Sequence, residues 1–273
     1  MRMKLCMTVL LAWLVFCGST VAAVVPRIEV NPDGKGLKLL VFERSDHHRN
    51  YVDRGKILGD LYFNYLVDNK TYSVKLSDLQ SEILENTAGK IQIFWQLPAG
   101  VRLYQTFTVS GEEIEWDIEF FNRSHHTVNI LDMCLTVPIG AIDESVQACQ
   151  NLNRHFSLNG NSSFLYWIPY TGQGDILLMS MKKGTAMEYA TWDGKYYLHA
   201  TNVVDRASDT WRIPSTSKTV APYQRYLTGF NFTVAKDHTD LRGKLYDKGN
   251  VLVKVAPGMV VTPEMEVYCA LQT

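Results

Sequence analysis

At the point that decides its fold, the chain reads Glu113-Ile114-Glu115-Trp116-Asp117-Ile118-Glu119-Phe120. Carboxylates alternate strictly with large apolar side chains along this stretch. Because successive side chains of a β-strand point to opposite faces, the alternation predicts a strand with one buried face and one wet face. Strands of this kind are typical of antiparallel sheets that cover a core on one side only.

The segment before this strand has the same period of two. The residues that fall on its apolar side are Val101, Leu103, Gln105, Phe107 and Val109, and a short turn around Gly111 follows. The two segments therefore predict a β-hairpin. After it, Asn122-Arg123-Ser124 is expected to turn the chain into a third strand over residues 127–137.

Short apolar runs bounded by Gly, Asn or Pro recur along the rest of the chain. They cover residues 37–43, 61–67, 71–76, 91–97, 164–168, 176–181, 186–191, 195–200, 223–234, 251–255 and 264–271. Spacing of this kind predicts an antiparallel all-β domain. Helix is expected only over residues 239–248, with Thr239 as a candidate N-cap and Gly249 as the stop, while residues 77–86 fit a helix or a strand.

The N-terminal residues 1–23 have the pattern of a secretory signal peptide. Arg2 and Lys4 form a basic start, residues 6–16 are apolar, and small residues follow. We therefore expect a secreted or periplasmic protein, with one β-supersandwich domain over residues 24–273. Phe16 stands before Cys17 where a lipid-attachment motif requires a small residue, which makes a lipoprotein the less favoured alternative. No later segment approaches the length of a membrane span.

Charge and cysteine content exclude several classes of ligand. The formal net charge is -1 without a basic run, so nucleic acid is not an expected partner. The cysteines after the signal segment are Cys134, Cys149 and Cys269, an odd number that leaves their disulfide state open. Adjacent histidines at 47–48 and 125–126 point to opposite faces of a strand, so no metal and no cofactor is predicted.

Aromatic rings and ionic groups crowd into residues 154–212. The apolar face of a pyranose stacks on such rings, and its hydroxyls need charged or amide partners. The side chains predicted to bind carbohydrate are Arg154, His155, Trp167, Tyr170, Glu188, Trp192, His199, Trp211 and Arg212. The competing interpretation is that the rings belong to the core and that the charged groups form ion pairs.

A family resemblance supports the carbohydrate interpretation. The motifs that carry it are Arg154-His155-Phe156-Ser157, Phe164-Leu165-Tyr166-Trp167, Gly184-Thr185-Ala186-Met187-Glu188-Tyr189, Tyr197-Leu198-His199, Thr210-Trp211-Arg212, Leu245-Tyr246-Asp247-Lys248-Gly249 and Pro257-Gly258-Met259. Their succession resembles an uncharacterised family of secreted glycosidase-like proteins in which a galactose-mutarotase-like supersandwich precedes an α/α toroid. The resemblance implies a large antiparallel supersandwich with little helix. The sequence to residue 273 ends where the resemblance would place the toroid, so we expect the catalytic residues of that domain to be absent from these residues.

Three functions follow as alternatives. The first is a carbohydrate-binding or domain-packing module of a glycoside hydrolase-like system, which is not catalytic alone. The second is a mutarotase-like aldose epimerase, because residues 153–160 resemble the histidine-bearing stretch of true mutarotases, although Ser157 replaces an Asn and only Glu264 and Glu266 remain as late carboxylates. The third is a purely structural module that docks on a separately encoded α/α-toroid catalytic domain.

Overall fold

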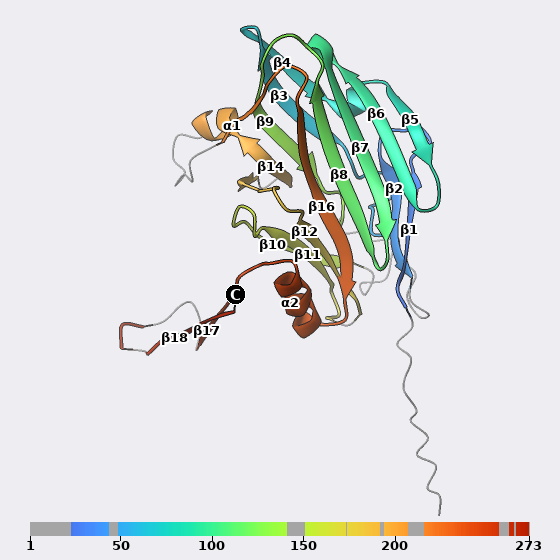
Figure 1. The fold of residues 1–273 in the computed structure, drawn as a ribbon. Coiled ribbons are helices and arrows are strands. Elements are labelled where there is room, and N and C mark those ends of the chain that lie inside the picture. The colour runs from blue at the N-terminus through green and yellow to red at the C-terminus, as the bar shows by residue number, and fades with distance from the viewer. Residues whose placement is uncertain are drawn as a thin grey trace, which may run out of the picture.

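The computed structural model describes residues 23–43, 49–140, 151–172, 174–191, 194–206, 216–256, 262–264 and 266–272. Within these residues two large antiparallel sheets pack face to face (Figure 1). Strands make up 57% of the chain and helices 9%, so the all-β prediction is confirmed. The proposed division into a signal peptide and one domain stays a prediction, because residues 1–22 lie outside the described ranges.

The larger sheet contains the strands that the alternating segments predict. In spatial order they are β10 (Leu152–Ser157), β11 (Phe164–Pro169), β12 (Ile176–Met181), β16 (Arg225–Ala235), β8 (Glu113–Asn122), β7 (Val101–Ser110), β6 (Lys90–Leu97) and β5 (Ser81–Asn86). The segment 77–86, which fitted a helix or a strand, forms the edge strand β5 over its last six residues, after a short 3-10 turn η1 (Leu76–Asp78).

The smaller sheet covers one face of the larger one. Its strands are β13 (Tyr189–Ala190), β14 (Lys195–Ala200), β9 (Val128–Thr136), β3 (Leu61–Val67) and β4 (Lys70–Lys75), with β15 (Lys218–Val220) paired to the start of β9. The predicted strand over residues 186–191 is reduced to the two residues of β13.

The remaining elements flank the sandwich. They are the ribbon of β1 (Val25–Val30) and β2 (Leu37–Glu43), the 3-10 turn η2 (Pro98–Gly100), the helices α1 (Thr201–Arg206) and α2 (His238–Asp247), and the hairpin of β17 (Leu252–Ala256) and β18 (Tyr268–Gln272). Helix α2 begins one residue before the predicted range, because the Asp237 carboxylate rather than Thr239 caps it. None of the helices in the described ranges is long and apolar enough to cross a membrane.

The predicted hairpin is observed as β7 and β8, which pair along their whole length. Its even-numbered apolar side chains, from Ile114 to Phe120, are fully buried between the sheets. At the end of β8 the Asn122 carboxamide closes the predicted turn, since its oxygen accepts hydrogen bonds from Ser124 and its nitrogen donates to the Val220 carbonyl. The turn is thereby tied to the strand that enters β16.

One polar side chain lies in the centre of this core. Gln105 is fully buried, donates to the Gly59 carbonyl at 2.7 Å and accepts from the Trp116 indole at 2.9 Å. Trp116 itself stacks on Phe107 with 5.3 Å between ring centroids. Gly59 has a φ of +118, and a side chain there would lie 3.0 Å from the Gln105 carboxamide oxygen. Position 59 therefore requires glycine.

We expect replacement of Gln105 to leave two buried polar groups unsatisfied. Gln105→Leu should lower the free energy of unfolding by roughly 2–4 kcal/mol, since each buried group that loses its partner costs about 1–3 kcal/mol. Gln92→Leu is the matched control, because Gln92 is half-buried and bonds only to Thr106 on the wet face, and it should cost less than about 1 kcal/mol. Urea unfolding measures both, and equal losses would contradict the assignment.

Candidate functional site

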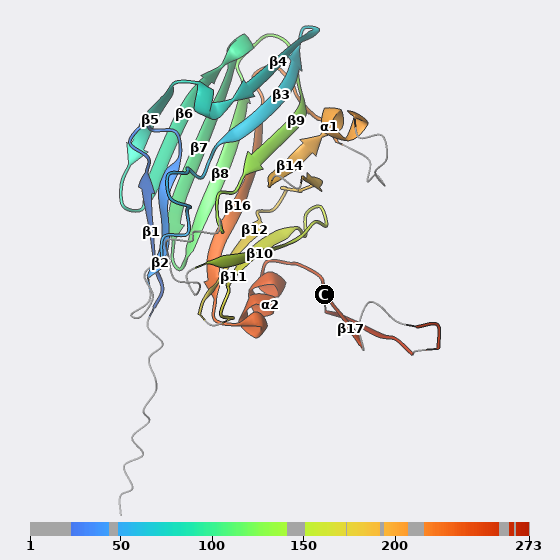
Figure 2. The same cartoon turned by 180° about the vertical axis from the view of Figure 1, so that it is seen from behind.

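The stretch that carries the predicted site residues runs along one edge of the sandwich. Strand β10 is outermost in the larger sheet, and β13 is outermost in the smaller one. Figures 1 and 2 both show β10, β11, β14 and α1 on the same side of the molecule. Residues from the two sheets can therefore meet at this edge.

His199 connects the two sheets there. It lies on β14 beside an irregularity in the strand pairing and is 8% exposed. Its Nε2 is 2.9 Å from the Tyr226 hydroxyl on β16, and its Nδ1 is 3.2 Å from the Thr216 hydroxyl. Burial, reinforced by the positive charge of Lys218, lowers the pKa of His199 to about 4. At neutral pH the imidazole is therefore uncharged and offers one donor and one acceptor.

Glu188, on the chain segment that leads into β13, is linked to His199 through Thr216. Its carboxylate accepts a hydrogen bond from the Thr216 backbone N–H at 3.1 Å. Burial raises the pKa of Glu188, while backbone hydrogen bonds from Thr216 and Ala200 act in the opposite direction. The carboxylate thus shares Thr216 with His199.

Tyr226 and Lys218 complete the group. Burial raises the pKa of the Tyr226 phenol, and the nearby Glu188 charge acts in the same direction, so the hydroxyl stays neutral. The Lys218 ammonium lies 5.2 Å from the centre of the Tyr226 ring. We call Glu188, His199, Thr216, Lys218 and Tyr226 the edge cluster.

The edge cluster combines a carboxylate, a neutral imidazole, two hydroxyls and an ammonium group. These groups can both donate and accept hydrogen bonds, which suits a ligand rich in hydroxyls. Among the described residues no three His, Cys, Asp or Glu side chains gather as a metal site would require. Cys134 is buried and Cys269 is exposed, while Cys149 lies outside the described ranges.

Two further predicted residues lie on β10, separate from the edge cluster. Arg154 lies over the Tyr196 ring, 5.7 Å from its centre, and its guanidinium approaches Gly194. His155 stacks on Tyr166 with 4.8 Å between ring centroids and 11° between the planes. Strand alternation places these two contacts on opposite faces of β10.

Trp167 lies in the core, although its clustering with other rings in the sequence did not show whether it was buried or at the surface. It is fully buried, and its indole N–H donates to the Ile139 carbonyl at 2.9 Å. Because alternation along β11 turns this side chain inward, the ring packs in the core and does not offer a face to a sugar at the surface.

Among the described residues, Tyr170 makes no hydrogen bond with the edge cluster. Tyr170 follows β11 and is 46% exposed, and its backbone N–H bonds to Asn151. Trp192, Trp211 and Arg212 lie outside the described residues, so their roles stay predictions.

Sequence reasoning did not single out Tyr226, Thr216 or Lys218. Tyr226 lies within the predicted strand over residues 223–234, and nothing in its local pattern distinguishes it from other strand tyrosines. Its meeting with His199 depends on which strands of the two sheets face each other. Which side chains meet across the two sheets therefore depends on the strand register of the folded sandwich, and local periodicity does not predict it.

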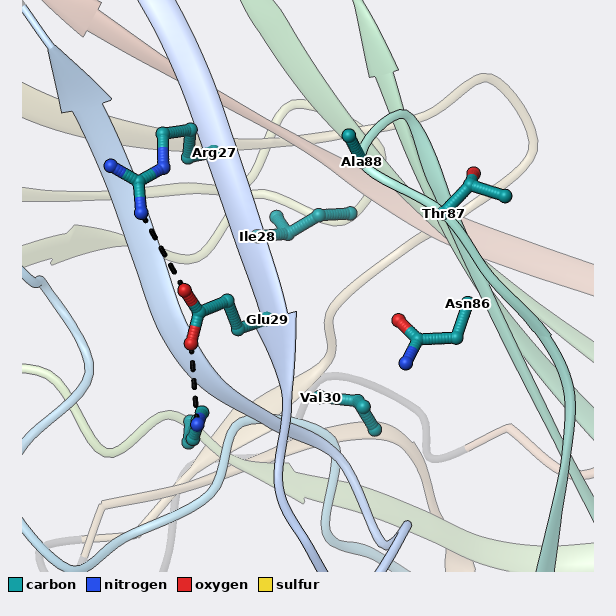
Figure 3. Close-up of a pocket in the computed structure, with 8 residues that line it drawn as sticks. Arg27, Ile28, Glu29, Val30, Asn86, Thr87 and Ala88 are labelled. Atoms are coloured by element: carbon teal, nitrogen blue, oxygen red, sulfur yellow. Dashed lines mark ion pairs between the residues drawn. The ribbon is translucent and has the colours of Figure 1, made fainter.

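A separate groove lies on the other side of the molecule, between β1 and the turn after β5 (Figure 3). Its volume is about 460 Å³, and its lining includes Arg27, Glu29 and Lys38. These side chains form ion pairs with one another, because the Glu29 carboxylate lies 3.5 Å from Arg27 and 3.2 Å from Lys38. The groove therefore offers less to a polar ligand than the edge cluster does.

Comparison with known proteins supports the fold. No protein-family model and no curated protein matches the chain. Among solved structures, a polysaccharide lyase matches with 13% identity and a TM-score of 0.66 over 86% of this chain and 36% of its own. A protein from Synechocystis matches with 9% identity and a TM-score of 0.51 over 79% and 96%. A galactose mutarotase related enzyme from Lactobacillus acidophilus matches with 9% identity and a TM-score of 0.47 over 80% and 98%.

These likenesses concern the fold. The chain spans about a third of the length of the polysaccharide lyase and nearly all of the Synechocystis protein. The large antiparallel sheets agree with the antiparallel β-supersandwich architecture that was predicted, and the polysaccharide lyase and the Synechocystis protein support this fold.

We expect the buried imidazole to make stability depend on pH. The pKa of His199 is about 4 in the folded protein, against about 6.5 in an unfolded chain, so the unfolded state binds more protons between these values. The free energy of unfolding should therefore fall by roughly 2–3 kcal/mol as the pH is lowered from 6.5 to 4. The raised pKa of Glu188 acts in the opposite direction over its own range.

Urea unfolding across this pH range tests the expectation. His199→Gln should flatten the dependence, while His126→Gln, at an exposed position in the turn after β8, should keep the wild-type slope. A variant without His199 that retains the full slope would show that other groups are responsible.

Proposed function

We propose that this chain is an exported carbohydrate-binding sandwich of a glycan-processing system and that the edge cluster contacts the sugar. One observation carries the proposal. Four separate parts of the chain meet here, because His199 on β14 contacts Thr216 before β15 and Tyr226 on β16, and Thr216 also bonds to Glu188 before β13. A set of alternating donors and acceptors at a sheet edge matches the hydroxyl pattern of a sugar.

The adjacent chain supports the same ligand. Residues 207–215 connect α1 to the segment before β15 and contain Trp211 and Arg212, two of the predicted carbohydrate-binding residues. They join the chain directly before Thr216, which bonds to both Glu188 and His199. An indole supplied from this segment would add the stacking surface that the edge cluster itself lacks.

The geometry favours binding over epimerisation. An epimerase needs an acid and a base on opposite sides of one sugar ring. His155 stacks on Tyr166 in the larger sheet, whereas Glu266 accepts a hydrogen bond from Tyr268 in the C-terminal hairpin. Figure 1 shows that this hairpin projects beyond α2, away from β10. The residues required by the mutarotase alternative are therefore not held around a common ligand.

A role in domain packing has its own support in the β17–β18 hairpin. Val253 and Leu271 pair across the hairpin and are 51% and 65% exposed. Val251 and Val267 fall on the same face by alternation, and both are exposed as well. An isolated two-stranded hairpin is marginally stable in water, so this apolar face is suited to a partner such as a separately encoded toroid domain.

Sugar binding is tested with a glycan array followed by calorimetry on the strongest ligand. Tyr226→Phe and Glu188→Gln should each weaken binding by about tenfold or more, since each removes a hydrogen bond from a half-buried site. Tyr223→Phe is the matched control, because its hydroxyl also bonds to a histidine, His125 at 2.7 Å, but at an exposed turn. It should change the affinity less than about twofold.

Two outcomes would contradict the binding proposal. One is the absence of binding to any arrayed glycan, and the other is an equal loss in Tyr226→Phe and Tyr223→Phe. Thermal unfolding of each variant, run in parallel, separates lost contacts from lost folding. If Tyr226 and Glu188 only stabilise the fold, their replacement would lower the melting temperature and leave the sugar affinity of the folded fraction unchanged.

The hairpin surface is tested in the free protein. The double variant Val253→Ser, Leu271→Ser should reduce the fluorescence of a bound apolar dye such as ANS. It should also change the free energy of unfolding by less than about 0.5 kcal/mol, because exposed side chains away from the core contribute little. A large loss of stability would show that the hairpin packs on its own sandwich.

A further inference from the structure

The outer face of the larger sheet is open over most of its width. Helix α2 packs against β11, β12 and β16 through Leu241 and Leu245. Figure 1 shows β5, β6, β7, β8 and β16 side by side in front of the smaller sheet, and none of the other labelled elements lies over them. Their outward side chains are half-exposed and available to a ligand.

Aromatic rings and guanidinium groups gather at one end of this face. Phe94 and Tyr104 face each other across β6 and β7, with 5.1 Å between ring centroids. The Arg102 guanidinium lies 5.7 Å from the Phe94 ring. Phe121, at the end of β8, has Arg225 at 4.2 Å and Arg123 at 5.8 Å from its ring centre. We call these six residues the Phe121 patch.

The charges of the patch are not balanced. Arg225 forms an ion pair with Glu119, but within the described residues Arg102 and Arg123 lie against rings and form no ion pair with a carboxylate. Farther along β8 the charge is of the opposite sign, since the single Lys182 ammonium lies 2.6 Å from both Glu115 and Asp117. Among the described residues, the two arginines without an ion pair therefore lie at the aromatic end of the open face.

We propose that the Phe121 patch binds an acidic oligosaccharide. Carboxylate or sulfate groups would pair with Arg102 and Arg123, since a guanidinium binds planar anions through two parallel hydrogen bonds. The apolar faces of the sugar rings would lie on Phe94 and Tyr104. The patch spans the adjacent strands β6, β7, β8 and β16, about 14 Å at the usual strand spacing, which gives room for more than one sugar unit.

The patch is distinct from the edge cluster. Arg225 and Tyr226 are neighbours on β16, so alternation directs Arg225 to the open face and Tyr226 to the space between the sheets. The proposal for the patch does not depend on sugar binding at the edge cluster, because it rests on a different set of contacts and on charge.

The proposal is tested by calorimetry at low salt with four ligands. They are oligogalacturonate, its methyl-esterified neutral form, a sulfated heparin-derived oligosaccharide and a short single-stranded DNA. At least one of the two acidic sugars should bind. If oligogalacturonate binds, its methyl ester should bind at least about tenfold more weakly than the acid. Affinity for the acidic sugar should fall as salt is added, because the pairing is between exposed charges.

Arg102→Gln and Arg123→Gln should each weaken binding of the acidic sugar by about tenfold or more. Arg242→Gln, at an exposed position on α2, is the matched control and should leave the affinity unchanged. The proposal is overturned if neither acidic sugar binds, if the ester binds as tightly as the acid, if DNA binds more tightly than both sugars, or if the two arginine variants behave like Arg242→Gln.

Discussion

The sandwich depends on how one carboxamide is accommodated inside an apolar core. Gln105 comes from β7 of the larger sheet, and its partner Gly59 belongs to the segment that enters β3 of the smaller sheet. The same carboxamide fixes the Trp116 indole, around which Phe107, Phe230 and Phe232 pack. A buried polar group tolerates little displacement of its partners, so this link sets how the two sheets face each other.

That alignment determines which side chains meet at the edge of the sandwich. His199 on β14 and Tyr226 on β16 belong to different sheets, and their hydrogen bond of 2.9 Å requires the sheets to keep one separation and one stagger. The strand that supplies Tyr226 also supplies Arg225 to the opposite face. One strand thus links the edge cluster and the Phe121 patch, and each depends on the register of β16 against β8.

The strands of the two sheets could be predicted from the sequence more fully than the contacts of the edge cluster. Strict alternation over residues 113–120 was enough to predict β8, its hairpin with β7 and the buried face, because strand periodicity is a local property. The same alternation could not show that Trp167 lies in the core, since both faces of β11 carry rings. Nor could it join His199 to Tyr226, which lie 27 residues apart and meet only through the packing of two sheets.

The polar character of the edge cluster is difficult to explain by stability alone. A neutral imidazole and a carboxylate in a half-buried site lose hydration, and this loss is what lowers the pKa of His199 and raises that of Glu188. Apolar side chains of similar size would close the same edge without that cost, as the leucines and valines of the neighbouring strands do. Thr216 bonds to both groups and Tyr226 bonds to His199, so these neutral partners hold the two groups in place without an ion pair. The proposed sugar binding would use these hydrogen-bonded polar groups, since polar groups in fixed positions orient a ligand.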